Sequence, residues 1–183
     1  MYRGNNPTAI QSQNWLAESL IVLMEEKPFS QITVQDICKK ADLSRQTFYN
    51  FFSAKEEILR YCLQQKYEEQ FSKYSDSLTI SIGEIVEAFT DVLTENKQLL
   101  NLMVNNGLDG IIADEISKCI SLFANRFVNS EHSKEILPYS ESLLSGALAH
   151  LLVFWFQQEK PISQNALNEI LTDFLDGNLY KIS

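Results

Sequence analysis

Three adjacent side chains, Arg45, Gln46 and Thr47, carry hydrogen-bonding groups of the kind that read nucleic-acid bases. A guanidinium can donate two hydrogen bonds to O6 and N7 of guanine, and a glutamine amide can pair with N6 and N7 of adenine. Each such pair contributes about 1–3 kcal/mol of discrimination against a wrong base. Other polar groups close by suit phosphate oxygens, which fix the position of a protein on a duplex; they belong to Thr33, Ser44, Tyr49, Asn50 and Lys55.

The surrounding pattern predicts two short helices that meet at a tight turn. Thr33 and Asp36 have the spacing of a capping-box variant at the start of the first helix. Asp42 stands where the chain must turn, and Asp tolerates a positive φ better than most residues other than glycine. Ser44 is placed to cap the second helix. The apolar stripe of the first helix has positions i, i+3, i+4 and i+7, namely Val34, Ile37, Cys38 and Ala41.

The second helix separates an aromatic face from a polar face. Phe48, Phe51 and Phe52 recur at i, i+3 and i+4, so they anchor this helix to a core. Gln46 and Asn50 point away from that core, and the first turn of such a helix is the part that meets base edges. We therefore interpret the segment as a helix-turn-helix that binds double-stranded DNA. The alternative is an ordinary capped helical hairpin with a solvated polar face.

The same residues resemble the TetR family of transcriptional regulators over about the first third of the chain. The resemblance lies in Ile32-Thr33, 37–41, Leu43-Ser44, 47–49, Phe51-Phe52 and 55–59. It implies a DNA-binding domain of three helices, followed by a larger helical domain that dimerises and often binds a small molecule. It also implies DNA contacts for Thr33, Arg45, Gln46, Thr47, Tyr49 and Lys55. One departure is Asp42, where family members usually carry glycine.

Helical periodicity continues through the remaining sequence without strand alternation, so we expect an all-α protein. The expected domains are residues 1–52, a helix-turn-helix domain with an N-terminal arm, and residues 53–183, a helical regulatory and dimerisation domain. A first helix over 8–27 braces the hairpin. Gly107 and Gly110 are expected to interrupt the helical pattern of the larger domain. Its helices are expected near 53–74, 81–96, 97–104, 111–128, 143–156 and 163–175.

The charge of the chain is unevenly distributed. Residues 1–60 hold seven Lys or Arg and seven Asp or Glu, whereas the whole chain carries a net charge of −9. The acidity therefore lies in the larger domain, away from the expected duplex. A neutral DNA-binding domain releases few counterions, which predicts weak non-specific binding and a shallow salt dependence.

The last two predicted helices indicate a homodimer. Nearly every residue from Leu143 to Phe156 is apolar, and a helix that is apolar all round must be covered on every side. Together with the helix that begins at Ser163, it could form a four-helix interface between two chains. The alternative is a deeply buried core helix in a monomer. A dimer with recognition helices about 34–36 Å apart, or a multiple of that spacing, would bind a pseudo-palindromic operator.

Aromatic residues and methionine in the larger domain are candidate ligand-pocket residues, although plain core packing competes for each: Phe89, Met103, Phe123, Tyr139 and Trp155. That any pocket exists follows from the family resemblance. The resulting hypothesis is a homodimeric repressor released by a small-molecule effector. The alternative is a DNA-binding adaptor or architectural protein whose larger domain binds a protein partner.

The sequence does not favour an enzyme. It has two histidines, His132 and His150, and lacks a glycine-rich phosphate loop and a nucleophile elbow, so we expect no catalytic residue and no cofactor. Glu131, His132 and Glu135 lie in a polar loop without cysteine partners, so we expect no metal site. The apolar run 146–156 is too short to span a bilayer. With no secretory signal and three scattered cysteines, a cytoplasmic protein is expected.

Overall fold

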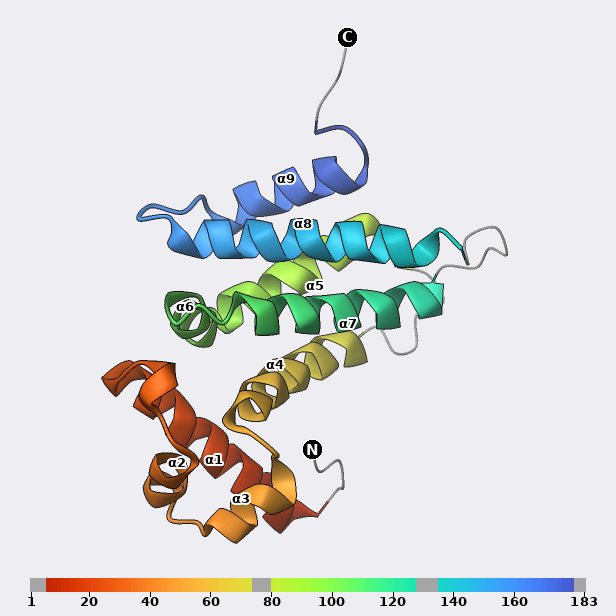
Figure 1. The fold of residues 1–183 in the computed structure, drawn as a ribbon. Coiled ribbons are helices and arrows are strands. Elements are labelled where there is room, and N and C mark those ends of the chain that lie inside the picture. The colour runs from red at the N-terminus through yellow and green to blue at the C-terminus, as the bar shows by residue number, and fades with distance from the viewer. Residues whose placement is uncertain (1–5, 74–79, 128–134, 180–183) are drawn as a thin grey trace.

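The computed structural model describes residues 6–73, 80–127 and 135–179, and the regular structure in these ranges is entirely helical (Figure 1). The expected all-α class is confirmed. The elements are α1 (Pro7–Glu26), η1 (Phe29–Gln31), α2 (Val34–Ala41), α3 (Arg45–Phe51), α4 (Lys55–Ser72), α5 (Ile82–Glu95), α6 (Lys97–Asn105), α7 (Asp109–Phe127), α8 (Leu137–Gln157) and α9 (Gln164–Leu175).

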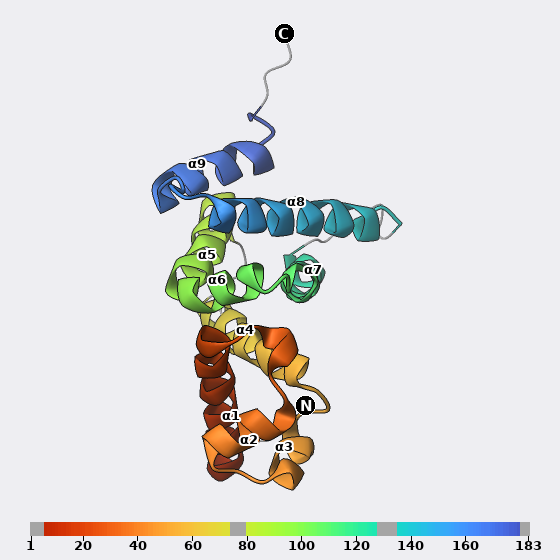
Figure 2. The same cartoon turned by 60° about the vertical axis from the view of Figure 1, so that its left-hand side comes forward.

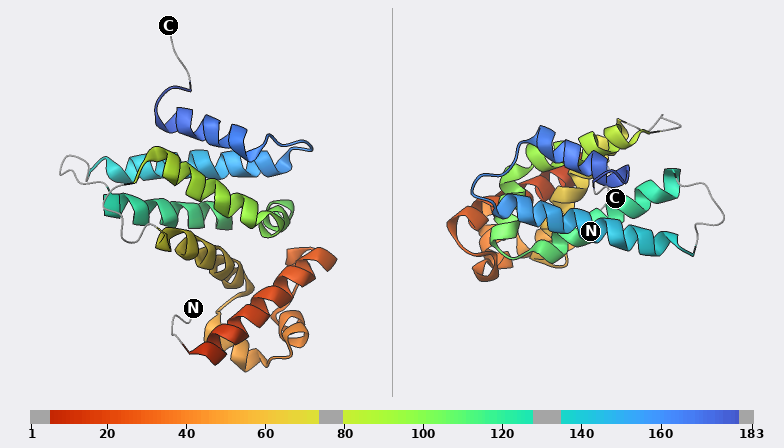
Figure 3. Two further views of the ribbon diagram at one scale, coloured as in Figure 1. Left: turned by 180° about the vertical axis from the view of Figure 1, so that it is seen from behind. Right: turned by 90° about the horizontal axis from the view of Figure 1, so that it is seen from above.

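The first three helices form the part of the molecule that we call the head (residues 6–52), and the remaining helices form the body (residues 53–179). The body is stacked above the head, with α8 and α9 at the end farthest from α3 (Figures 1 and 2). The views from behind and from above show α8 and α9 closing that end of the molecule (Figure 3). Any surface on α3 is therefore well separated from any surface on α9.

Local capping explains why the helices begin where they do. The Ser81 hydroxyl accepts a hydrogen bond from the Glu84 N–H, and the Glu84 carboxylate accepts one from the Ser81 N–H at 2.8 Å, as a capping box requires. The Ser163 hydroxyl caps α9 by accepting the Ala166 N–H at 3.3 Å. Both starts agree with the sequence prediction. Helix α8 begins earlier than expected, at Leu137.

Of the two glycines expected to interrupt the helices, one lies between helices and the other lies within a helix. Gly107 has a φ of 66° just after α6, a left-handed conformation that glycine adopts without steric cost. Gly110 instead lies inside the first turn of α7 and interrupts nothing. The expected loop at 129–135 falls almost wholly outside the described residues. Within the described ranges, no helix is both long and apolar enough for a membrane crossing.

One buried apolar cluster extends from the head into the body. Phe48 of α3 is fully buried, and its ring centroid lies 5.9 Å from that of Phe52. Phe52 in turn lies 5.7 Å, centroid to centroid, from Tyr61 of α4. Burying one such aromatic side chain contributes about 1.5–3 kcal/mol relative to leaving it exposed. The aromatic residues expected to anchor the second helix therefore also connect α3 to the body; Phe51 is only partly buried.

Candidate nucleic-acid interface

The turn between α2 and α3 has the geometry of a helix-turn-helix. Asp42 adopts φ 52° and ψ 41°, the left-handed conformation expected for it. Its N–H and that of Leu43 both donate to the Cys38 carbonyl, which closes α2. Ser44 then caps α3, with its hydroxyl accepting the Thr47 N–H at 3.0 Å. These contacts fix the angle between the two helices without a glycine.

Helix α3 lies at the end of the molecule opposite α9 (Figure 2). Arg45, Gln46 and Asn50 are exposed, and Tyr49 is 51% exposed. The guanidinium carbon of Arg45 lies 6.0 Å from the Tyr49 ring centroid, at the outer limit of a cation–π contact. The structure thus brings the base-reading candidates together on one accessible helix, with Thr47 half-buried beside them.

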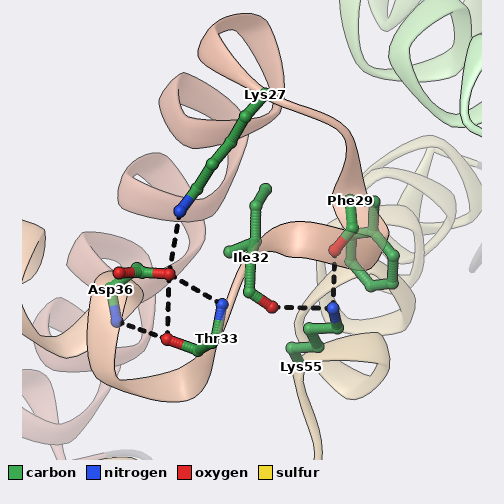
Figure 4. A network of polar contacts seen from close by, with 6 residues as sticks. All are labelled: Lys27, Phe29, Ile32, Thr33, Asp36 and Lys55. Atoms are coloured by element: carbon green, nitrogen blue, oxygen red, sulfur yellow. Dashed lines mark hydrogen bonds and ion pairs between the residues drawn. The ribbon is translucent and has the colours of Figure 1, made fainter.

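Two of the expected phosphate-binding hydroxyls already have partners. The Thr33 hydroxyl donates to the Asp36 carboxylate at 2.8 Å, and the Thr33 N–H donates to the same oxygen at 2.9 Å (Figure 4). The Ser44 and Thr47 hydroxyl oxygens lie 2.8 Å apart. Any phosphate contact at these positions must therefore use the remaining lone pairs and donors or rearrange the cap.

Asp36 is the centre of a small charged network (Figure 4). The Lys27 ammonium lies 2.9 Å from its carboxylate, and this hydrogen bond lowers the pKa of Asp36 most. The backbone and hydroxyl hydrogen bonds from Thr33 lower the same pKa further, well below its usual range. The carboxylate stays charged at neutral pH and holds the start of α2 against the end of α1.

Lys55, expected to contact a phosphate, is already bound to backbone carbonyls within the protein. Its ammonium donates to the Phe29 carbonyl at 2.6 Å and the Ile32 carbonyl at 2.7 Å (Figure 4). The same nitrogen lies 4.2 Å from the centroid of the Phe29 ring. A lysine ammonium has three donors, so one remains for a phosphate. Lys55 therefore ties the start of α4 to η1.

A residue of the body, Asn106, also hydrogen-bonds to η1, and no sequence pattern indicated this contact. The side-chain carbonyl oxygen of Asn106, after α6, accepts the Phe29 N–H at 2.7 Å. The amide nitrogen of Asn106 donates to the Leu102 carbonyl at 2.7 Å, which orients the side chain. Gln98 and Glu25 form a further hydrogen bond between α6 and α1. No sequence pattern predicts a contact between residues 77 positions apart.

Three of the six described cations in residues 6–60 are paired with acids. Lys40 lies 2.6 Å from Glu26, and Arg60 lies 2.8 Å from Asp114. Lys27 is paired with Asp36 and Lys55 with two carbonyl oxygens, so two described cations in residues 6–60 have neither kind of partner. These are Lys39 and Arg45, and both are exposed.

The candidate pocket residues of the body do not gather at one site. Phe89 lines a cavity of about 300 Å³ between α4, α5, α7, α8 and α9. Met103 and Trp155 are core residues outside this lining, and the Trp155 indole donates to the Ile162 carbonyl at 2.9 Å. Tyr139 is 79% exposed, which corrects its assignment as a pocket residue. The side chain of Phe123 lies outside the described residues.

Of the three residues considered as metal ligands, only Glu135 lies within the described residues. Glu131 and His132 lie outside the described residues, and Glu135 and His150 are exposed. No cluster of three or more His, Cys, Asp or Glu side chains with metal-binding geometry occurs within residues 6–73, 80–127 and 135–179.

Comparison with known proteins agrees with this geometry. Residues 19–62 match the family model of the bacterial regulatory proteins of the tetR family. The chain is 35% identical over 72 residues to the HTH-type dhaKLM operon transcriptional activator DhaS of Lactococcus lactis, covering 39% of this chain and 38% of that protein. It is 25% identical over 173 residues to the HTH-type transcriptional regulator YxbF of Bacillus subtilis, covering 89% of this chain and 44% of that protein. These alignments span less than half the length of either relative.

Solved structures share the fold over nearly the whole chain. Lin0861 from Listeria innocua superposes with a TM-score of 0.77 at 16% identity, covering 97% of this chain and 96% of that chain. A TetR transcriptional regulator from Streptococcus agalactiae gives 0.60 at 17% identity, covering 92% and 95%. Similarity at this identity establishes the fold, while the match over residues 19–62 covers the helix-turn-helix itself. The helix-turn-helix of this chain therefore matches the TetR family of transcriptional regulators, as the resemblance of its residues led us to expect.

Proposed function

We propose that this chain binds a specific operator through α3, with residues 1–52 as its DNA-binding domain and residues 53–183 as its regulatory and dimerisation domain. The observation that carries the proposal is the exposed polar face of α3 on a helix held from behind by fully buried Phe48. A rigid helix with free donors and acceptors at its start is what direct readout in the major groove needs.

Within this proposal, Arg45 and Gln46 contact base edges. Their side chains are exposed and have no hydrogen bond within the described residues, so they are available to a partner. Thr47 lies beside them in the same first turn, and Tyr49 and Asn50 contact the phosphates on either side. Thr33, Ser44 and Lys55 contribute through the donors and lone pairs that their internal contacts leave free.

The proposed dimer forms through α8 and α9. Tyr139, Leu143 and Phe154 follow one face of α8 at helical spacing, and Leu143 and Phe154 are 73% and 55% exposed. Ile170 and Phe174 of α9 are one helical turn apart and are also exposed. Several large apolar side chains on neighbouring helices mark an interaction surface. A second copy of the chain covers this surface in the proposal, and the two heads then bind a pseudo-palindromic operator.

The proposed control is release of a repressor by a small-molecule effector, which the cavity beside Phe89 can accommodate. An effector changes DNA affinity only by its differential affinity for the two forms of the dimer. Activation is a second candidate, favoured by the similarity to the Lactococcus lactis transcriptional activator DhaS. A promoter reporter carrying the selected operator, with and without the chain, distinguishes the two.

Selection of DNA from a random pool tests the proposal directly. We expect a pseudo-palindrome whose half-sites lie one helical turn apart or a multiple of it. Selection with Arg45→Ala should lose base preference at one position of each half-site and keep the spacing. Lys97→Ala, an exposed lysine of α6 in the body, serves as the matched control and should select the wild-type sequence. Failure to enrich any sequence contradicts the proposal.

A further inference from the structure

The cavity in the body has an almost purely hydrocarbon lining. It is bounded by five helices, with Phe89 of α5, Leu148 of α8 and Leu171 of α9 among its walls. None of the described side chains that line it is an Asp, Glu, Lys, Arg or His. Transferring an unpaired charge into such surroundings is very unfavourable, so an ionised ligand is excluded.

Three lining residues carry polar groups: Tyr67 and Gln70 of α4 and Cys119 of α7. The Gln70 amide is already engaged, because its nitrogen donates to the Glu95 carboxylate at 3.2 Å. Its oxygen accepts a hydrogen bond from the Lys73 ammonium at 2.6 Å. Both polar atoms of the Gln70 amide are therefore engaged by other side chains and are not free for a ligand.

Tyr67 differs from Gln70 because its hydroxyl has no hydrogen-bond partner within the described residues. The residue is only 8% exposed, and its hydroxyl oxygen is not among the fully buried unpartnered atoms of the described residues, so the oxygen keeps some accessible surface at which a small molecule can bind. Burial raises the pKa of Tyr67 far above its usual value and the pKa of Cys119 to about 12. Both groups stay protonated at neutral pH. The cavity thus offers one good neutral donor and one weak one.

We propose that this cavity binds a neutral organic molecule of about ten non-hydrogen atoms, mostly hydrocarbon, with one oxygen that accepts a hydrogen bond from Tyr67. The size follows from the volume of about 300 Å³, at roughly 30 Å³ for each water-sized group. Medium-chain alcohols, aldehydes and ketones have this chemistry. The inference rests on the proposed ligand-responsive function, since it names the chemical class of the effector.

Three eight-carbon probes that differ only in the terminal group test the proposal on the full chain by isothermal titration calorimetry. We expect 1-octanol to bind one molecule per chain and octanoate and octylammonium to bind at least tenfold more weakly. Tyr67→Phe keeps the ring and removes the donor, so 1-octanol should bind about three- to tenfold more weakly. Leu148→Met conserves side-chain volume and serves as the control that keeps wild-type affinity.

A cavity-filling variant tests whether the ligand binds in this cavity without removing a hydrogen bond. Ala88→Leu adds three carbons to the lining and should abolish 1-octanol binding while the protein still melts cooperatively. Octanoate binding as tight as that of 1-octanol overturns the proposal, as does unchanged affinity in Tyr67→Phe. If Ala88→Leu does not fold, the Tyr67→Phe result decides.

Operator binding by the ligand-free protein, measured in parallel, separates the two proposals. A chain that binds its operator but not 1-octanol overturns the inference and leaves the DNA-binding function standing. A chain that binds 1-octanol in the Tyr67-dependent manner but selects no DNA supports the cavity assignment and overturns the regulatory function.

Discussion

The salt dependence of operator binding is set by how few cations the DNA-binding surface leaves unpaired. Lys39 and Arg45 are the two cations in residues 6–60 with neither an acidic partner nor a pair of carbonyl acceptors. The proposed dimer would therefore present four such charges. At about −0.9 per neutralised phosphate, log affinity against log salt should fall with a slope of about −1.8 if only Lys39 contacts phosphate, and of at most about −3.6 if the Arg45 charge also displaces counterions.

The remaining donor of Lys55 sets the steepest slope that we expect. If it contacts phosphate in both chains, the slope steepens to about −5.4. Between slopes of about −3.6 and −5.4, raising the salt from about 50 to 200 mM should weaken binding by about two to three orders of magnitude. Full participation of all six described cations in residues 6–60 would instead give a slope near −11.

Fluorescence anisotropy with a labelled operator measures the slope. Two adjacent lysines supply a matched pair, because Lys40 is bound to Glu26 whereas Lys39 is not. Lys39→Gln should flatten the slope by up to about 1.8 for the dimer, whereas Lys40→Gln should leave it unchanged. A wild-type slope steeper than about −9, or equal flattening by the two variants, would refute the reasoning.

Three further predictions concern stability and assembly. Asp42→Gly should stabilise the protein by about 0.5–1 kcal/mol in urea unfolding, because glycine adopts the observed φ of 52° without strain; Asp42→Ala should destabilise it, and the reverse order would contradict this. Asn106→Ala removes the acceptor of the Phe29 N–H, so it should cost about 1 kcal/mol and speed hydrogen exchange at that amide. Asn105→Ala, at the exposed neighbouring residue, should change neither the free energy of unfolding nor the exchange rate of the Phe29 amide. Leu143→Asp on α8 should convert a dimer to a monomer in sedimentation velocity, whereas Val22→Asp on α1 should not; a persisting dimer places the interface elsewhere.

Much of the fold was predictable because its signals are local. A hydroxyl followed three residues later by a carboxylate identifies a helix start wherever it occurs, as at Thr33 and Ser81. The conformation of Asp42 was predictable for the same reason, since a turn between two helical stripes leaves few backbone choices. Gly110 was misjudged because glycine is tolerated in the first turn of a helix as well as between helices.

The body was harder to predict because periodicity identifies a buried face without saying what that face contacts. Phe89 and Met103 lie on similar apolar stripes, yet Phe89 borders a cavity and Met103 is fully buried in the core. Tyr67, which contributes the unpartnered hydroxyl, has no sequence feature that separates it from other buried tyrosines. A void depends on how five helices pack together, and no single stripe contains that information.

The sequence by itself determined the helices, their caps and the residues that α3 presents to solvent, since these depend on neighbours within one or two turns. The tertiary structure alone decided which charges remain available. Lys55 and Lys39 have equal formal charge, yet one is bound to the carbonyls of Phe29 and Ile32 and the other is exposed. Such contacts join residues far apart in the chain, and a hydrogen bond to a backbone carbonyl depends on its position in space and not on the identity of the residue that carries it.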